Sequence, residues 1–476
     1  MSLSSALSYA FSGLRSNSRA AGLVSTNIAN ATTESYGKRE LVLGAGFNGG
    51  VRIGGVARLV DPALVTDRRQ SDSQLGYADT MFQFVKSMED TMGLSGEPGS
   101  FVGRVEAFEN SLLTAASNPA STQRLEMVAT TANDLANTLN SLSDKVQALR
   151  SDADRKIGAQ VELLNQTLTR LDEINIDVVR GTIAGSDMNA LLDERDKLLD
   201  GISDIIPLRV VEGDRGEVTV YSKGGAVLLD SSPASFEFTP AITVRAGDTL
   251  AGGELSGLTL NGLAVNSVMF AGGSLQANFD VRDTEGVARQ AELDAIARDL
   301  IERLGPGGPD TTLGATDPGF FTDAGIAFDP LAEEGIAARI QLNALVAPAS
   351  GGSWRIRDGL GAATQGEVGD ARLIQGIKAA LSEPTLPGSG TLAPIARSFV
   401  NHASEFASTL SGTRVRAENA QTYQVSRNTA LKEAELAKGV DTDLELQRLM
   451  QIEQLYTANA KVMTAVDQML ERLMQI

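Results

Sequence analysis

Cysteine is absent from this 476-residue chain, and histidine occurs once, at His402. Without cysteine the protein has no disulfide, no thiolate nucleophile and no thiolate metal site. One histidine leaves only carboxylate-rich sites for a hard metal ion, so we expect His402 to be structural and expect no metal or other cofactor. Neither a G-x-S-x-G elbow nor a G-K-[ST] phosphate loop occurs. The sequence therefore predicts no catalytic site and no enzyme.

Basic residues and long apolar runs are also scarce. The 60 acidic residues outnumber the 41 Lys and Arg, and the net charge of −19 argues against a nucleic-acid-binding protein. No run of 18 apolar residues occurs, so no membrane span is predicted. The first residues do not form a charged segment followed by an apolar core. We therefore expect no cleaved signal peptide, and an exported chain would need another route.

The chain does contain an apolar heptad pattern at each end, with alternating spacings of three and four residues. The first stripe comprises Leu3, Leu7, Ala10, Leu14, Asn17, Ala21, Val24 and Ile28. The last comprises Leu449, Ile452, Tyr456, Asn459, Met463, Val466, Leu470 and Leu473. A second stripe on the same C-terminal segment repeats every seven residues, at Leu455, Val462, Met469 and Ile476. Such patterns are typical of helices that pack along other helices.

Two interpretations of these stripes are open. One is an ordinary antiparallel coiled coil within a single chain. The other is that the terminal helices complete their packing only against neighbouring subunits. We favour the second because the C-terminal helix carries an additional stripe, which is more apolar surface than one partner helix requires. Asn17 and Asn459 fall on stripe positions, where a polar residue can fix the register of two helices.

Between its ends the chain changes from helical to strand-like periodicity and back. Helices are predicted at 61–91, 102–116, 122–179 and 189–205, strand-like pieces from 208 to 281, and further helices at 288–304, 330–339, 370–381 and 393–438. The fold class is therefore mainly α with a smaller β-rich domain, built on a long helical rod whose N- and C-terminal helices pack together as a coiled coil. The strand-like region is flanked on both sides by helices, and this order suggests that the β-rich part lies farthest from the chain ends.

Three domains are predicted from this order. Residues 1–45 and 439–476 form a terminal coiled-coil assembly domain, residues 46–206 and 285–438 a helical rod domain, and residues 207–284 an outer β-rich domain. The glycine-rich stretch from Gly44 to Gly55 is interpreted as a connector.

Two groups of acidic residues in the rod could suggest chemistry. The run Asp193-Glu194-Arg195-Asp196-Lys197 resembles a paired-carboxylate site, but its intervening basic residues favour a solvated helix face. Asp152 and Asp154 are likewise interpreted as surface residues of the rod.

The segment from Asn27 to Tyr36, directly after the first helix, resembles the Ala-Asn-x-x-Thr-x-Gly-Tyr signature of flagellar rod, hook and hook-associated proteins. Ser35 stands where this family usually has glycine, so we expect a slightly shifted turn. The segment from Asp441 to Ile476 resembles the partner helix of the same family. In the interior, residues 191–221 and 272–283 are similar to the hook-associated members of the family.

This resemblance implies a structural subunit of the bacterial flagellum, which forms the junction between hook and filament and assembles through its terminal helices. It implies an extracellular location after type III export without a cleaved signal. The expected partners are further copies of the chain in a ring or helical lattice, the hook protein, a second junction protein, and an export chaperone on the C-terminal helix. The assembly interface is predicted to comprise Leu3, Leu7, Leu14, Val24, Ile28, Asn30, Thr33, Tyr36, Leu449, Ile452, Leu455, Tyr456, Asn459, Val462, Met463, Val466, Met469, Leu470, Leu473 and Ile476.

Three other functions remain as alternatives. A hook or distal-rod protein would share these ends, although such proteins have a more β-rich interior. A cell-envelope hydrolase associated with the flagellum would need a cleft with an isolated acidic pair, which the sequence does not indicate. A coiled-coil adaptor would not account for the β-rich region or for the segment from Asn27 to Tyr36.

Overall fold

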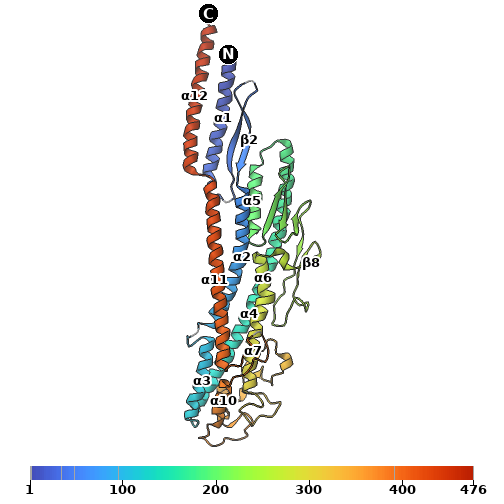
Figure 1. The fold of residues 1–476 in the computed structure, drawn as a ribbon, viewed down its shortest axis with the longest axis vertical. Helices are drawn as coiled ribbons and strands as arrows, with labels where there is room; N and C mark the ends of the chain where they lie inside the picture. The colour runs from blue at the N-terminus through green and yellow to red at the C-terminus, as the bar shows by residue number, and fades with distance from the viewer. Residues whose placement is uncertain (1–2, 34, 48, 95, 391, 475–476) are drawn as a thin grey trace.

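The computed structural model describes residues 3–33, 35–47, 49–94, 96–390 and 392–474. The molecule is an elongated bundle in which both ends of the chain lie at the same end of the long axis (Figure 1). Helices dominate and the sheets are small, so the predicted fold class is confirmed. No helix in the described part of the chain is long and apolar enough to cross a membrane.

The helices follow the predicted periodicity closely. They are α1 (Leu3–Ala29), α2 (Pro62–Met92), α3 (Phe101–Ser117), α4 (Thr122–Ala184), α5 (Asn189–Ser203), α6 (Ser274–Asp280), α7 (Gly286–Arg303), α8 (Ile336–Arg339), α9 (Arg355–Asp358), α10 (Arg372–Ser382), α11 (Phe399–Lys438) and α12 (Thr442–Met474). A π-helical segment, Val281–Glu285, joins α6 to α7.

The strands form four small antiparallel sheets. They are β1 (Lys38–Ala45), β2 (Val51–Leu59), β3 (Leu208–Glu212), β4 (Val218–Ser222), β5 (Val227–Leu229), β6 (Phe236–Glu237), β7 (Leu258–Leu260), β8 (Leu263–Val265), β9 (Phe321–Asp323) and β10 (Ile340–Leu342). The pairings are β1–β2, β3–β4–β5, β6–β7–β8 and β9–β10.

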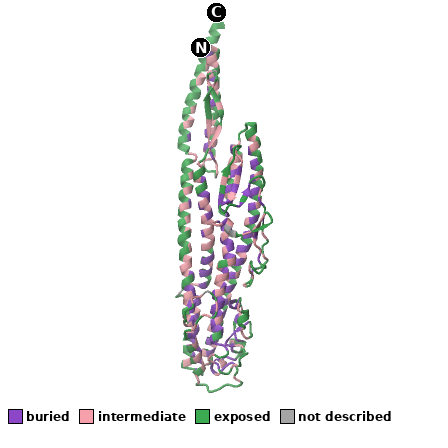
Figure 2. Cartoon of the chain, turned by 45° about the vertical axis from the view of Figure 1, so that its right-hand side comes forward, coloured by how far each residue is buried: buried purple, intermediate pink, exposed green. Residues whose placement is uncertain are grey.

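Helix α4 is the axis of the molecule. Its 63 residues extend about 95 Å at a rise of 1.5 Å per residue, and it ends at Gly185 in the left-handed conformation that glycine adopts most readily. Its N-terminal half packs into one hydrophobic core with α2, α3, α7, α10 and α11. Its C-terminal half packs into a second core with α5, α6 and the sheets β3–β8. Buried residues concentrate in this body, whereas α12 is largely exposed (Figure 2).

The position of the β-rich region differs from the prediction. The sheets β3–β8 lie beside the C-terminal half of α4, about midway along the molecule, and the end farthest from the termini is formed by α3, α10 and the loops near them (Figure 1). The reason is that α4 runs back toward the chain ends, so the strands that follow it return alongside the helix.

The strand-like pieces predicted between residues 208 and 281 are not strands throughout. Residues 274–280 are helical, as α6. Residues 242–245 have no strand partner, because side chains of α4 hold this segment instead. The Ser151 hydroxyl accepts a hydrogen bond from Val244 N at 3.2 Å, and the buried Arg150 guanidinium donates to Arg245 O at 2.8 Å.

The predicted connector from Gly44 to Gly55 is largely a β-hairpin. Residues 38–45 pair with residues 51–59 in antiparallel register. The domain boundary predicted between residues 45 and 46 therefore falls inside one hairpin, since β2 belongs with β1 rather than with the helical rod. The three-domain division as a whole stays a prediction.

Asp154 is fully buried, which corrects its interpretation as a surface residue. Its Oδ1 accepts a hydrogen bond from the buried Arg282 at 2.7 Å, and its Oδ2 accepts one from Ala241 N at 2.6 Å. The Arg282 guanidinium also lies over the rings of Phe238 and Phe279, at 5.5 and 5.0 Å from their centroids. This pair joins α4 to the π-helical segment and to the β-rich region.

We predict that Asp154→Ala lowers the free energy of unfolding by about 2–3 kcal/mol, because Arg282 keeps Asp283 as a partner but loses its fully buried carboxylate, and Ala241 N loses its acceptor. Asp152→Ala is the matched control, since the ion pair of Asp152 with Arg155 is exposed and should contribute less than about 1 kcal/mol. Denaturant unfolding followed by circular dichroism measures both. Equal losses in the two variants would contradict the prediction.

Candidate assembly surface

We call α1, α12 and the β1–β2 hairpin together the terminal module. The two helices run antiparallel, and the hairpin packs on α1 (Figure 1). Small residues let the helices approach closely: a Cβ atom on Gly13 would lie 2.7 Å from Asn459 Nδ2. Asn17 Nδ2 is buried and has no hydrogen-bond partner in the described part of the chain. The side chain of Asn459 thus faces Gly13. Among the described residues, no hydrogen bond between Asn17 and Asn459 fixes the register of α1 against α12.

The structure brings together most of the first stripe on each terminal helix. On α1, Val24 is buried, and Leu3, Leu7, Leu14 and Ile28 are partly buried. On α12, Val466 is buried, and Leu449, Ile452, Asn459 and Met463 are partly buried. Three residues of the α12 stripe are exposed, namely Tyr456, Leu470 and Leu473.

The second stripe of α12 remains open to solvent. Leu455, Val462 and Met469 are 55%, 46% and 46% exposed. Ile476, also predicted to belong to this stripe, lies outside the described residues. Helix α1 therefore covers one face of α12 and leaves a neighbouring apolar face without a partner. The role of these residues in assembly stays a prediction.

Asn27 organises the turn that follows α1. Its Oδ1 accepts hydrogen bonds from Tyr36 OH at 2.9 Å and Arg39 N at 3.0 Å. Its Nδ2 donates to Arg39 O at 2.9 Å and to Glu445 Oε2 at 3.0 Å. Because all of its hydrogen-bonding capacity is used at a buried position, this amide fixes how α1, β1 and α12 meet.

Three residues that were predicted to belong to the interface make contacts within this turn. Asn30 Nδ2 donates to Thr26 O at 2.9 Å, and Thr33 Oγ1 donates to Asn30 Oδ1 at 3.2 Å. Tyr36 bonds to Asn27, and burial raises the pKa of Tyr36 against the opposing effect of the nearby Arg39. Asn30, Thr33 and Tyr36 therefore shape the turn inside one chain.

Glu445 attaches the first turns of α12 to this turn. Its side chain is completely buried, and Lys38 Nζ lies 3.3 Å from its Oε1. Arg448, one turn further along α12, lies 3.6 Å from the same oxygen and also pairs with Glu40 of β1. A buried carboxylate is stable here only because these cations and the Asn27 amide surround it.

A cluster of ion pairs joins the terminal module to the body, and we call this region the joint. Asp193, Asp196 and Asp200 lie on one face of α5 at spacings of three and four residues. They pair with Arg39 of β1, Arg58 of β2, and Arg68 and Arg69 of α2, at distances of 2.6–3.0 Å. Arg68 also pairs with Glu435 of α11 at 2.5 Å.

The solvated-face interpretation of the acidic run is therefore wrong for Asp193 and Asp196, whose side chains are only 17% and 14% exposed. The 3–4 spacing of the three aspartates is visible in the sequence. Their partners are not, because Arg39 and Asp193 are 154 positions apart. Burial opposes the charged form of Asp200, but Arg69 and Arg68 outweigh it and keep the pKa of this carboxyl below its usual range.

Ser35 keeps a glycine-like backbone conformation, with φ of 61°. We expected the turn to shift because glycine is absent here. Ser35 instead adopts the left-handed backbone conformation that glycine would have at this position. Two hydrogen bonds hold it there: Ser35 Oγ donates to Asp200 Oδ2 at 2.8 Å, and Ser35 O accepts from Arg58 at 3.1 Å. The turn is thus tied to the joint.

Comparison with known proteins shows two family matches. Residues 85–305 match the model of the flagellar hook-associated protein FlgK helical domain, and residues 437–476 match the C-terminal model of flagellar basal body rod FlgEFG proteins. The first match covers much of the body of the molecule, and the second covers α12. Both models describe parts of bacterial flagellar proteins, so over these residues the chain is similar to structural components of the flagellum.

Within that class, the chain is similar to flagellar hook-associated protein 1, which confirms the resemblance expected from the sequence. It is 26% identical to that protein of Salmonella typhimurium over 243 residues, covering 49% of this chain and 44% of the relative. It is 24% identical to that of Bacillus subtilis over 233 residues, covering 46% of each. The matched part thus spans less than half the length of these relatives.

A solved structure of the flagellar hook junction protein FlgK from Burkholderia pseudomallei is also similar. Its TM-score is 0.44 at 17% identity, covering 54% of this chain and 46% of that one.

We predict that Ser35→Ala lowers the free energy of unfolding by about 1–2 kcal/mol, because the strained backbone remains and the hydrogen bond to a charged carboxylate is lost. Ser35→Gly loses the same bond but relieves about 1 kcal/mol of left-handed strain, so it should be the more stable of the two variants. Thermal unfolding of both variants tests the order. A more stable alanine variant would show that the left-handed conformation does not govern this position.

We predict that the stabilising effect of Asp200 disappears in acid. Because its folded pKa is lowered, its contribution is fully present above the ordinary aspartate pKa of about 3.9 and is lost as the pH falls through the lower folded value. Asp200→Asn should therefore unfold at a lower temperature than the wild type at pH 6, and the difference should shrink below about pH 4. Asp144→Asn is the matched control at pH 6, where it should leave the unfolding temperature nearly unchanged, because Asp144 is exposed on α4 and has no ion pair among the described residues. If the difference in unfolding temperature between Asp200→Asn and the wild type did not change with pH, the charge of Asp200 would not be the source of its stabilising effect.

Proposed function

We propose that this chain is a structural subunit of the bacterial flagellum, which forms the junction between hook and filament and assembles through its terminal module. The match of residues 85–305 to the helical domain of a hook-associated protein supports the junction role. The match of residues 437–476 to the C-terminal segment of rod proteins supports assembly through α12. Both matches belong to structural proteins, and this supports a role without catalysis.

The observation that carries the proposal is the uncovered apolar face of the helix that matches the rod family. Each of Leu455, Val462 and Met469 is about half exposed in the single chain. Burying a side chain of this size completely stabilises a structure by about 1.5–3 kcal/mol, so each has roughly 1 kcal/mol still to contribute on assembly. A lattice of many copies repeats this contribution at every subunit.

The proposed partners follow from this role. They are further copies of the chain in a ring or helical lattice, the hook protein, and a second junction protein toward the filament. Export through the flagellar type III route would place the chain outside the cell as part of the flagellum. During export, a chaperone could cover the apolar face of α12 until assembly.

A hook or distal-rod protein is the second candidate, supported by the match of residues 437–476. The longer match to the hook-associated helical domain favours the junction role. A flagellar hydrolase gains no support from the open pocket between α3 and α4, which has no carboxylate among its lining residues Ala107, Asn110, Ser111, Thr114, Gln123, Arg124, Met127 and Thr131. The described residues also contain no group of three potential metal ligands.

The junction role is tested in a strain from which the gene for this chain is deleted. Electron microscopy should show complete hooks without filaments, and the wild-type gene should restore filaments. Filaments of normal length on the deletion strain would refute the role, and loss of the hooks themselves would favour a rod or hook protein.

We predict that replacing Leu455, Val462 and Met469 together by serine leaves a folded chain that does not restore filaments, because the polar side chains remove the apolar face without disturbing the α1–α12 contact. The matched control replaces three exposed apolar residues of α4, namely Met127, Leu163 and Ile183, by serine. The control should restore filaments. Circular dichroism of the purified chains checks folding, and normal filaments with the α12 variant would contradict the assembly role.

A further inference from the structure

We infer that two opposite sides of the terminal module are complementary, so that the α12 side of one copy packs on the hairpin side of the next copy. This inference rests on the proposed function and adds which surface meets which. The uncovered apolar face of α12 is covered by the β1–β2 hairpin of a second copy of the chain, together with the adjoining surface of α1.

The first observation is the arrangement of the terminal module. Helix α1 lies between α12 and the hairpin, as Figure 1 shows. Near the joint, Lys38 and Glu40 of β1 meet Glu445 and Arg448 of α12. Farther along, α12 and the hairpin diverge on either side of α1. The module therefore presents two outward sides, one formed by α12 and the other by the hairpin.

The second observation is that both outward sides expose apolar side chains. On α12 these are Leu455, Val462 and Met469. On the hairpin they are Val42, Leu43 and Phe47, and Phe47 at the turn is completely exposed. A two-stranded hairpin is marginally stable by itself, and an apolar outer face on it is costly in water. Contact between the two sides would bury both apolar groups at once.

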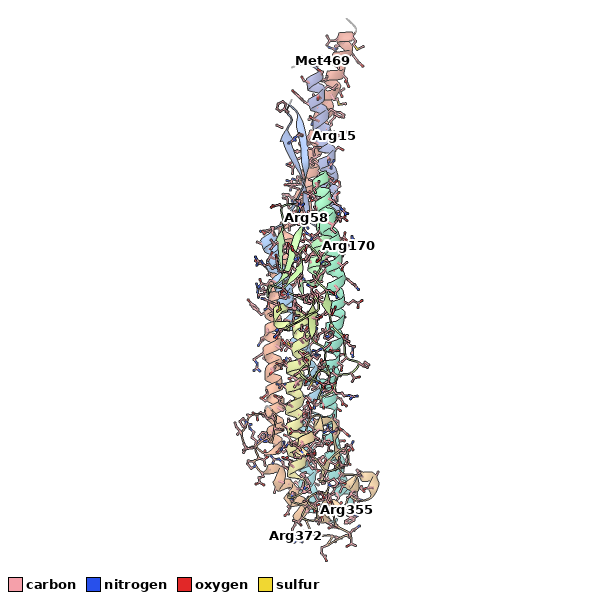
Figure 3. All side chains as sticks on the ribbon, turned by 90° about the vertical axis from the view of Figure 1, so that its right-hand side faces the viewer. Arg15, Arg58, Arg170, Arg355, Arg372 and Met469 are labelled. Carbon is pink, nitrogen blue, oxygen red and sulfur yellow. The ribbon has the colours of Figure 1, made fainter. Side chains whose placement is uncertain are left out.

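The third observation is that the two sides differ in charge. Residues 1–60 contain six Lys or Arg and two Asp or Glu, a net charge of +4 in a chain whose total is −19. Arg15, Arg19 and Arg52 are exposed and make no ion pair within the described residues. Figure 3 shows Arg15 and Met469 on the same module, above Arg58 at the joint.

Helix α12 has the opposite net charge, −2, from five acidic and three basic residues. Exposed on it without an ion pair among the described residues are Asp443, Glu453, Asp467 and Glu471, against Lys461 and Arg472. Two α12 sides brought together would repel, as would two hairpin sides, whereas unlike sides attract. The contact is therefore heterologous, with different surfaces of the two copies in contact. A heterologous contact repeated from copy to copy produces a ring or a helix rather than a two-fold dimer.

The absence of cysteine in the chain allows a direct test by disulfide cross-linking. We would prepare two full-length variants with different tags, Phe47→Cys and Val462→Cys, and mix them at high concentration under mild oxidation. The expected product is the mixed disulfide, in about tenfold excess over either homodimer, since only unlike sides meet. Ile183→Cys replaces Phe47→Cys in the control, because Ile183 is also well exposed, near the end of α4, but lies outside the module.

The charge argument is tested in the same assay. Adding Arg52→Glu to the Phe47→Cys chain should reduce the mixed disulfide several-fold. Adding Arg209→Glu, at an exposed position of β3, should not. Homodimers in excess, or cross-linking of Ile183→Cys as strong as that of Phe47→Cys, would overturn the inference.

Because this assay uses purified chains, its outcome is separate from that of the proposed function. Mixed disulfides formed by a chain that fails to restore filaments would leave the inference standing and remove the junction role. Restored filaments without mixed disulfides would leave the junction role standing and remove the inferred contact between the two sides.

Discussion

The ion-pair cluster at the joint is the interaction on which the relation between the terminal module and the body depends. Neither hydrophobic core includes a residue of α1, α12 or the hairpin. The chain passes between the module and the body at two short connections, residues 60–61 and 439–441. With no apolar core across the joint, the aspartates of α5 and the arginines of β1, β2 and α2 set the orientation of the module. Such contacts are directional, and they are weakened by salt and acid far more than a packed core is.

Buried arginines have a related role inside the body. Arg150 donates to the main-chain oxygens of Arg245 and Asp248, and Arg282 pairs with Asp154. Arg303 donates to the main-chain oxygens of Ala380, Glu383 and Arg397. In each case one guanidinium on or next to a long helix holds an irregular segment that has few apolar side chains to bury. The planar, multi-donor group of arginine suits this task because it satisfies several carbonyl oxygens at once.

The terminal module combines two kinds of packing with different requirements. Its inner surface is completed within one chain, where Val24 and Val466 are buried and Gly13 admits Asn459. Its outer surface is not, since Leu455, Val462 and Met469 remain half exposed. A module whose inner surface is packed within one chain, but which retains uncovered apolar surface, is suited to a subunit that stays separate before assembly and packs closely afterwards. The net charge of −19 favours that separation, because copies repel one another until complementary surfaces meet.

The helices, the stripes of the two terminal helices and the family resemblance could be predicted from the order of the amino acids. Helical periodicity and a short signature such as that from Asn27 to Tyr36 are local properties, readable within one or a few turns. Which charges are buried could not be predicted in this way, because Arg39, the partner of Asp193, and Arg282, the partner of Asp154, lie more than a hundred positions away. The same holds for the place of the β-rich region, which depends on the direction in which α4 returns, and for Ser35, whose conformation depends on Asp200 and Arg58. Ion pairs between residues far apart in the sequence produce no periodic pattern in it, and the joint is held together by such pairs.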